Sequence, residues 1–131
     1  MKFNPVIWFD IYVQDMARAQ KFYEAVFQFN MQNMTDPTDE HLKMVGFPSV
    51  DETPDKMFPG TSGSLVEMKG MASGGNSTLV YFTSEDCSIE EKRVEKAGGK
   101  LVRPKMSIGQ YGFISLAQDT EGNMFGIHSM K

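Results

Sequence analysis

The chain has 131 residues, of which 40% are hydrophobic, and its 17 acidic and 13 basic residues give a formal net charge of -4. This length predicts one ordinary domain, and the acidic balance, with no run of Lys or Arg, argues against a nucleic-acid partner. The single cysteine, Cys87, excludes an internal disulfide and favours a reducing compartment; with no segment apolar enough for a signal peptide or membrane span, we expect a cytoplasmic protein without a membrane partner.

The first expected elements are a strand and a helix. Apolar residues alternate with Trp8, Asp10 and Tyr12, which predicts a half-buried strand whose second face is aromatic and acidic. Asp15 follows as a helix N-cap, and apolar residues then recur at helical spacing, so a helix of about three turns is expected to run to Phe27. A strand with such a mixed face is suited to line a pocket.

The rest of the first half is expected to hold strands and loops. Pro and Gly punctuate the chain between apolar runs, which predicts strands over residues 42–47 and 64–69, a loop over residues 48–63 and a flexible connection over residues 70–77.

The second half begins with another strand-like run and a helix. Ser88 and Glu91 have capping-box spacing, and the pair Gly98 and Gly99 is expected to end this helix. Three strands follow in the prediction, the last two joined by the turn sequence DTEGN: residues 100–102, 111–117 and 123–129, with a loop over residues 104–110.

The two halves repeat one another. Residues 6–31 can be laid over residues 77–102 at a constant offset of 71 positions, which places Asp15 on Asp86 and Glu24 on Glu95. Both windows run from a strand through an acidic cap into a helix and a second strand. A duplicated supersecondary unit predicts a pseudo-symmetric fold with a pocket between the halves.

Five segments carry a resemblance to a known family: WFDIYVQDMARAQKFYEAVF, SLVEM, TLVYFTSED, VEKAGGKLVRPK and DTEGNMFGIHS. In this order the chain resembles the vicinal oxygen chelate superfamily, which includes glyoxalase I, extradiol dioxygenases and the bleomycin and fosfomycin resistance proteins. The resemblance implies an α+β fold of two βαβββ modules that form a curved, partly open β-barrel cup, each with one helix packed outside. It also implies one glyoxalase-like domain, with modules over about residues 5–70 and 78–131, and a homodimer.

The resemblance also bears on cofactors. In metal-dependent members four side chains in the cup hold a divalent ion, and the matching positions here are Trp8, Glu67, Leu79 (Thr78 with a shift of one) and Gly126. Only Glu67 retains a metal donor, and one donor does not hold a metal. No cofactor is therefore expected.

A displaced metal site is the alternative. Asp10 is two residues from Trp8 and His128 two from Gly126, so each shares a strand face with an expected ligand position, and Asp10, Glu67 and His128 would form the set. Each of these residues also has a structural interpretation. Asp10 could pair with a nearby Lys or Arg, and His128 could hydrogen-bond to backbone or water. For Glu67 the functional and structural interpretations are both kept open.

Two functions follow. The first is a small-molecule-binding protein or metal-independent enzyme, with Trp8, Asp10, Tyr12, Tyr81 and His128 as ligand-binding residues and Glu67 as the candidate catalytic residue. Trp8 can instead seal the barrel as core. The alternative is a metal-dependent lactoylglutathione lyase-like lyase or isomerase, or a dioxygenase, with relocated ligands. A sequestering dimer of the resistance type is a variant of the first function.

Overall fold

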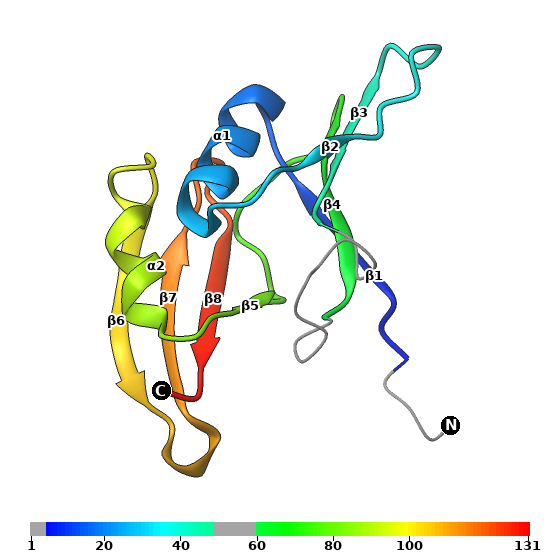
Figure 1. Cartoon of the computed structure of the whole chain (residues 1–131). Coiled ribbons are helices and arrows are strands. Elements are labelled where there is room, and N and C mark those ends of the chain that lie inside the picture. The colour runs from blue at the N-terminus through cyan, green and yellow to red at the C-terminus, as the bar shows by residue number, and fades with distance from the viewer. Residues whose placement is uncertain (1–4, 49–59) are drawn as a thin grey trace.

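The computed structural model describes residues 5–48 and 60–131 and shows two modules of the same element order (Figure 1). The first module contains β1 (Trp8–Tyr12), α1 (Met16–Phe27), β2 (Gln32–Asn33), β3 (Leu42–Gly46) and β4 (Ser62–Met68). The second contains β5 (Tyr81–Thr83), α2 (Cys87–Val94), β6 (Lys100–Ser107), a 3-10 turn (Gly109–Tyr111), β7 (Phe113–Gln118) and β8 (Met124–Ser129). The α+β class and the two βαβββ modules are confirmed.

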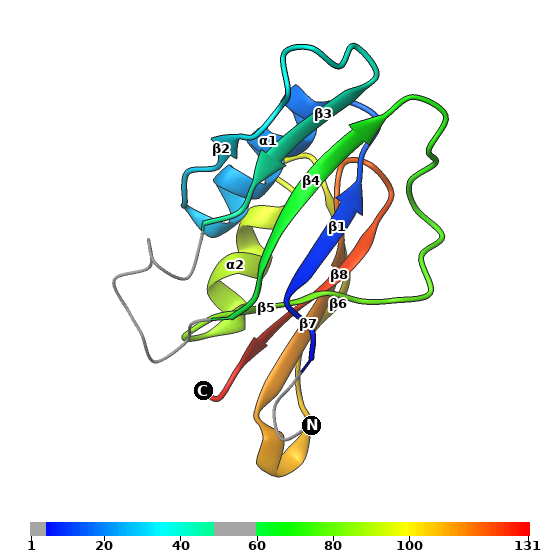
Figure 2. The same cartoon turned by 90° about the vertical axis from the view of Figure 1, so that its right-hand side faces the viewer.

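Each module forms its own four-stranded mixed sheet. The strand orders are β1-β4-β3-β2 and β5-β8-β7-β6, so the first strand of each module lies at an edge and pairs in parallel with the last. The register pairs Asp10 with Ser64 and Tyr12 with Val66. Side chains of paired residues share a sheet face, so Trp8, Asp10, Ser64 and Tyr12 lie together on one face of the first sheet. Figure 2 shows β1 running alongside β4 in this sheet.

Helix α1 forms where its sequence pattern predicts it. Asp15 is the N-cap, and its side chain accepts a hydrogen bond from the Arg18 N–H at 3.1 Å. The helix ends at Phe27, followed by Gln28 in the left-handed conformation. Among the described residues no helix has the length and apolar character needed to cross a membrane.

The core combines both modules. Helices α1 and α2 contact each other, and α1 lies beside both sheets in Figure 1. Its buried face meets rings from several strands, forming one aromatic cluster: Phe9, Phe22, Tyr23, Phe27, Phe29, Phe47, Phe82 and Phe125. Burying a ring of this size contributes about 1.5 to 3 kcal/mol, so the shared cluster supplies much of the attraction between the modules.

Three local predictions in the second module are wrong. Asp86, rather than Ser88, caps α2 and accepts a hydrogen bond from the Ser88 N–H at 3.0 Å. Helix α2 ends at Val94, before the two glycines. Strand β6 continues through Pro104 to Ser107, across the expected loop, because it is an edge strand with irregular register where a missing N–H is tolerated. Most of the loop expected over residues 48–63 lies outside the described residues.

The DTEGN turn between β7 and β8 reaches across to the start of α1. Glu121 Oε1 accepts hydrogen bonds from the N–H groups of Gln14 and Asp15, both at 2.9 Å. Arg18 closes a bidentate ion pair, with its Nε 2.7 Å from Oε2 and its Nη2 2.8 Å from Oε1. Glu121 is only 8% exposed. A residue of the second module therefore binds the amides that precede the first helix.

Protonation of Glu121 is strongly opposed. Burial alone would raise the pKa of this carboxyl, but hydrogen bonds from Arg18, Thr120, Gln14 and Asp15 outweigh burial and lower the pKa to about 2. These hydrogen bonds therefore stabilise the charged form of Glu121 in the folded state.

We expect the substitution Glu121→Gln to lower the free energy of unfolding by about 2 to 4 kcal/mol, because an amide NH₂ would face donors that now bind a carboxylate. Urea denaturation at pH 7 measures this loss. The folded pKa of about 2 lies below the ordinary 4.5, so the contribution of Glu121 is complete above about pH 4.5 and is lost as the pH falls towards 2. The difference between wild type and variant should therefore shrink over that range.

The control is Glu40→Gln, since Glu40 is exposed; this variant should change stability by less than about 0.5 kcal/mol. Equal losses for the two variants, or a difference that does not vary with pH, would contradict the role of Glu121.

Candidate functional site

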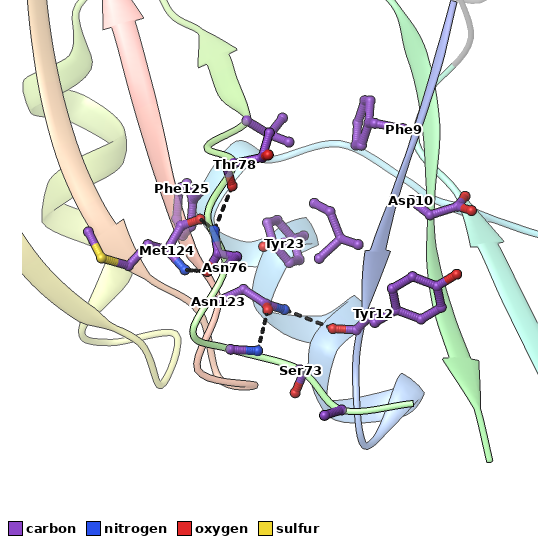
Figure 3. A pocket seen from close by; sticks show the side chains of 14 residues that line it. Phe9, Asp10, Tyr12, Tyr23, Ser73, Asn76, Thr78, Asn123, Met124 and Phe125 are labelled. Atoms are coloured by element: carbon purple, nitrogen blue, oxygen red, sulfur yellow. Dashed lines mark hydrogen bonds between the residues drawn. The ribbon is translucent and has the colours of Figure 1, made fainter. Parts of the chain in front are cut away.

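A cavity of about 250 Å³ lies between the two modules. Its walls are the open edge of β1, the segment that connects the modules, and the start of β8, with α1 behind (Figure 3). The lining residues are Phe9, Asp10, Ile11, Tyr12, Tyr23, Ala72, Ser73, Gly74, Asn76, Thr78, Val80, Asn123, Met124 and Phe125. This volume is slightly below the range of about 300 to 1,000 Å³ that is typical of ligand pockets, so only a small ligand would fit.

Aromatic rings form the apolar wall. Phe9 and Tyr23 extend into the space beside β1, with Phe125 opposite (Figure 3). The Tyr23 hydroxyl donates to Asp119 Oδ2 at 2.7 Å. Burial, together with the neighbouring Asp119 carboxylate, raises the pKa of Tyr23 well above its ordinary value, and burial raises the pKa of Asp119 although its hydrogen bonds oppose the shift. Tyr23 therefore presents a neutral ring to the cavity.

Asn123 joins three parts of the wall. Its Nδ2 donates to the Tyr12 carbonyl at 2.8 Å, and its Oδ1 accepts from the Gly74 N–H at 2.7 Å. Its own N–H donates to Asp119 Oδ1 at 2.8 Å. The side chain thus ties β1 and the connecting segment to the DTEGN turn.

Asn76 fixes the connecting segment against β8. Its Nδ2 donates to the carbonyls of Thr78 and Met124, at 2.7 and 3.2 Å, and its Oδ1 accepts from the Met124 N–H at 3.1 Å. The amide groups of the wall are therefore occupied by bonds within the protein.

Three of the predicted ligand-binding residues lie on β1. The side chains of Asp10 and Tyr12 point to the sheet face away from Tyr23 (Figure 3), and Trp8, 41% exposed, shares that face by register. Asp10 Oδ1 accepts from Trp8 Nε1 at 2.9 Å and from Ser64 Oγ at 3.0 Å. Asp10 is thus bound by an indole and a hydroxyl rather than by the Lys or Arg of the structural alternative.

The other two predicted ligand-binding residues lie on the second sheet. Tyr81 is 48% exposed, and its ring occupies the space that a Cβ at Gly126 would take. His128 Nε2 lies 2.7 Å from the Tyr111 carbonyl oxygen, which is the backbone contact expected as its structural role. Neither side chain lines the cavity, and their part in ligand binding stays a prediction.

Glu67 lies on the opposite face of its strand from Ser64 and Asp10. Its Oε1 accepts from the Met16 N–H, in the first turn of α1, at 2.8 Å, and its Oε2 is 3.5 Å from Lys43 Nζ. This placement separates it from Asp10, so Asp10, Glu67 and His128 do not converge. The catalytic assignment of Glu67 stays a prediction, and the contacts observed stabilise the helix.

The donor set does not fit the metal of the metal-dependent superfamily members. Position 8 carries an indole, position 126 has no side chain and is covered by Tyr81, and Glu67 is bound at the start of α1. Over residues 5–48 and 60–131, no group of three or more His, Cys, Asp or Glu side chains is arranged to hold a metal ion.

Sequence reasoning missed several cavity residues, among them Asn76 and Asn123, and named Thr78 only as a shifted alternative to Leu79. The segment GMASGGNS was interpreted as a flexible connection and DTEGN as a hairpin turn. The usable signal was the pair of asparagines, because an Asn side chain in a loop or turn often hydrogen-bonds to main-chain groups.

The sequence and the fold are similar to those of known proteins. Residues 5–127 match the family model described as Glyoxalase/Bleomycin resistance protein/Dioxygenase superfamily. No curated protein matches. Among solved structures that share the fold, a hypothetical protein from S. aureus is 20% identical with a TM-score of 0.66, and the match covers 97% of this chain and 95% of that one. Glyoxalase I from Zea mays is 21% identical with a TM-score of 0.67, and the match covers 94% of this chain and 43% of that one. TnmS3, an antibiotic binding protein from Streptomyces sp. CB03234, is 21% identical with a TM-score of 0.63, and the match covers 98% of each chain. The chain thus spans less than half of the maize enzyme.

We expect added Zn²⁺, Ni²⁺, Mn²⁺ or Fe²⁺ to leave the melting temperature unchanged, because the donors do not converge. An ion at 100 times its Kd would stabilise the fold by about 2.7 kcal/mol, which differential scanning fluorimetry detects readily. As the matching control, EDTA should also leave the melting temperature unchanged. A rise of several degrees with one of these ions, reversed by EDTA, would contradict the expectation.

Proposed function

Because the chain belongs to the glyoxalase/bleomycin resistance protein/dioxygenase superfamily, we propose that it binds a small molecule without a metal, in the cavity between the two modules. The observation that carries this proposal is the cavity itself, which combines a wall of buried aromatic rings with a hydrogen-bonded polar edge. A concave, mostly apolar site with a few placed polar groups is the usual form of a small-molecule site.

The chemistry of the lining favours binding over catalysis. Among the described residues that line the cavity, the ionisable ones are Asp10, Tyr12 and Tyr23. The first two side chains point away (Figure 3), and the Tyr23 hydroxyl is bound to Asp119. No free general acid or base therefore faces the space. The antibiotic-binding protein TnmS3, which shares this fold, supports binding as a use of the scaffold.

We also propose the homodimer that the family resemblance implies. Large apolar side chains are exposed on the faces of both sheets that point away from the aromatic cluster, which are called the outer faces below. They include Trp8 at 41%, Met68 at 38% and Tyr81 at 48%. A second copy that covers these faces would remove them from water.

Sedimentation velocity at micromolar concentration should show a dimer, and Trp8→Ser should weaken it. A wild-type monomer at 100 µM would contradict the dimer proposal and leave the cavity proposal intact.

The ligand proposal is tested with indole as a neutral bicyclic probe. Thr78 lines the cavity and is exposed, so Thr78→Phe should fill the cavity without disturbing the core and weaken indole binding at least about tenfold, or by 1.4 kcal/mol. Binding is measured by ¹H–¹⁵N chemical-shift titration, with shifts expected at cavity residues.

The matched control is Thr83→Phe, because Thr83 is exposed on the outer face of the second sheet and pairs with His128. It should leave indole binding unchanged. Shifts that gather around Trp8 and Tyr81, with equal affinity in both variants, would place the ligand site on the outer faces and overturn the cavity proposal.

A further inference from the structure

The main chain of β1 presents unpaired polar groups to the cavity. Strand β1 is an edge strand, and the Val13 N–H donates to the Val66 carbonyl of β4 at 2.9 Å. In a parallel ladder with Tyr12 opposite Val66, the N–H and C=O groups of alternate residues point to the two sides of the strand. The main-chain N–H and C=O groups of Phe9 and Ile11 therefore point to β4. The main-chain N–H and C=O groups of Asp10 and Tyr12 point to the open edge.

Two observations show that this edge faces the cavity. Asp10 and Tyr12 belong to its lining although their side chains point to the other sheet face (Figure 3), so their main-chain atoms form the wall. The Tyr12 carbonyl accepts from Asn123 Nδ2, which is itself part of the lining.

Asp10 offers the free pair of groups. Within the described parts of the chain, its N–H and C=O have no hydrogen-bond partner, whereas the Tyr12 carbonyl is taken by Asn123. The side-chain amides of Asn76 and Asn123 are also occupied. Asp10 thus offers one donor and one acceptor, adjacent and pointing the same way, as between residues that exchange both bonds in a sheet.

The rest of the cavity wall disfavours a charged ligand. The Asp10 carboxylate is bound on the other face by Trp8 and Ser64, and the Tyr23 hydroxyl is bound to Asp119. A charged ligand would enter an apolar space with no counter-charge, at a large desolvation cost. The rings of Phe9, Tyr23 and Phe125 favour a flat, apolar body.

We infer that the cavity recognises a neutral, flat ring compound with a cyclic amide, whose C=O accepts from the Asp10 N–H and whose N–H donates to the Asp10 C=O. A cyclic amide holds its N–H and C=O on the same side, so it can exchange both bonds with one extended residue, as an added strand does. The inference rests on the proposed cavity function and gives its ligand class.

The test compares three bicyclic probes of similar size: oxindole, which has the cyclic amide; N-methyloxindole, which lacks the donor; and 1-indanone, which keeps only a carbonyl. We expect oxindole to bind at least about tenfold more tightly than either analogue. In ¹H–¹⁵N titrations its largest downfield shifts should include the Asp10 amide, and Thr78→Phe should weaken its binding.

Each other outcome is decisive. Equal affinities for all three probes, with shifts in the cavity that Thr78→Phe suppresses, would overturn the cyclic-amide inference and leave the cavity as a binding site. Binding that is unaffected by Thr78→Phe and shifts only the outer sheet faces would overturn both. Tighter binding of oxindole without a shift of the Asp10 amide resonance would also overturn the inference, because a group other than Asp10 would then bind the amide of oxindole.

Discussion

The hydrogen bonds between Glu121 and the start of α1 join the two modules of this protein. The amides of Gln14 and Asp15 and the Arg18 guanidinium belong to the first module, and the second module supplies their acceptor. The carboxylate is buried, so its acceptance of these donors fixes the distance and direction of α1 relative to the DTEGN turn. The aromatic cluster packs around the helix in this position.

The same turn shapes the cavity. Asp119 binds the Tyr23 hydroxyl, and Asn123 binds the Tyr12 carbonyl and the Gly74 N–H. Stability and the proposed binding function therefore share one structural element. The cavity lies on the helix side of β1, whereas Trp8, the first of the positions matched to metal ligands, lies on the opposite face of that strand.

Much of the fold follows from local sequence. The alternation around Trp8, Asp10 and Tyr12, the Asp15 cap and the helical pattern to Phe27 predict β1 and α1 within one or two residues. These features depend on neighbours in the chain, so periodicity and capping chemistry are sufficient. The α2 cap was predicted wrongly, because Asp86 rather than Ser88 accepts the hydrogen bond at the start of the helix. The length of β6 was also predicted wrongly, because its edge position accommodates Pro104.

By itself the sequence determined two modules, their order and the absence of matched metal donors at positions 8, 79 and 126. Only the tertiary structure decided the use of Glu67 at the α1 start, the bonds of Asn76 and Asn123 to distant main-chain groups and the open edge of β1 at the cavity. The reason is physical: a side chain's polarity is local information, but its partner is selected by packing between segments about 50 to 110 residues apart.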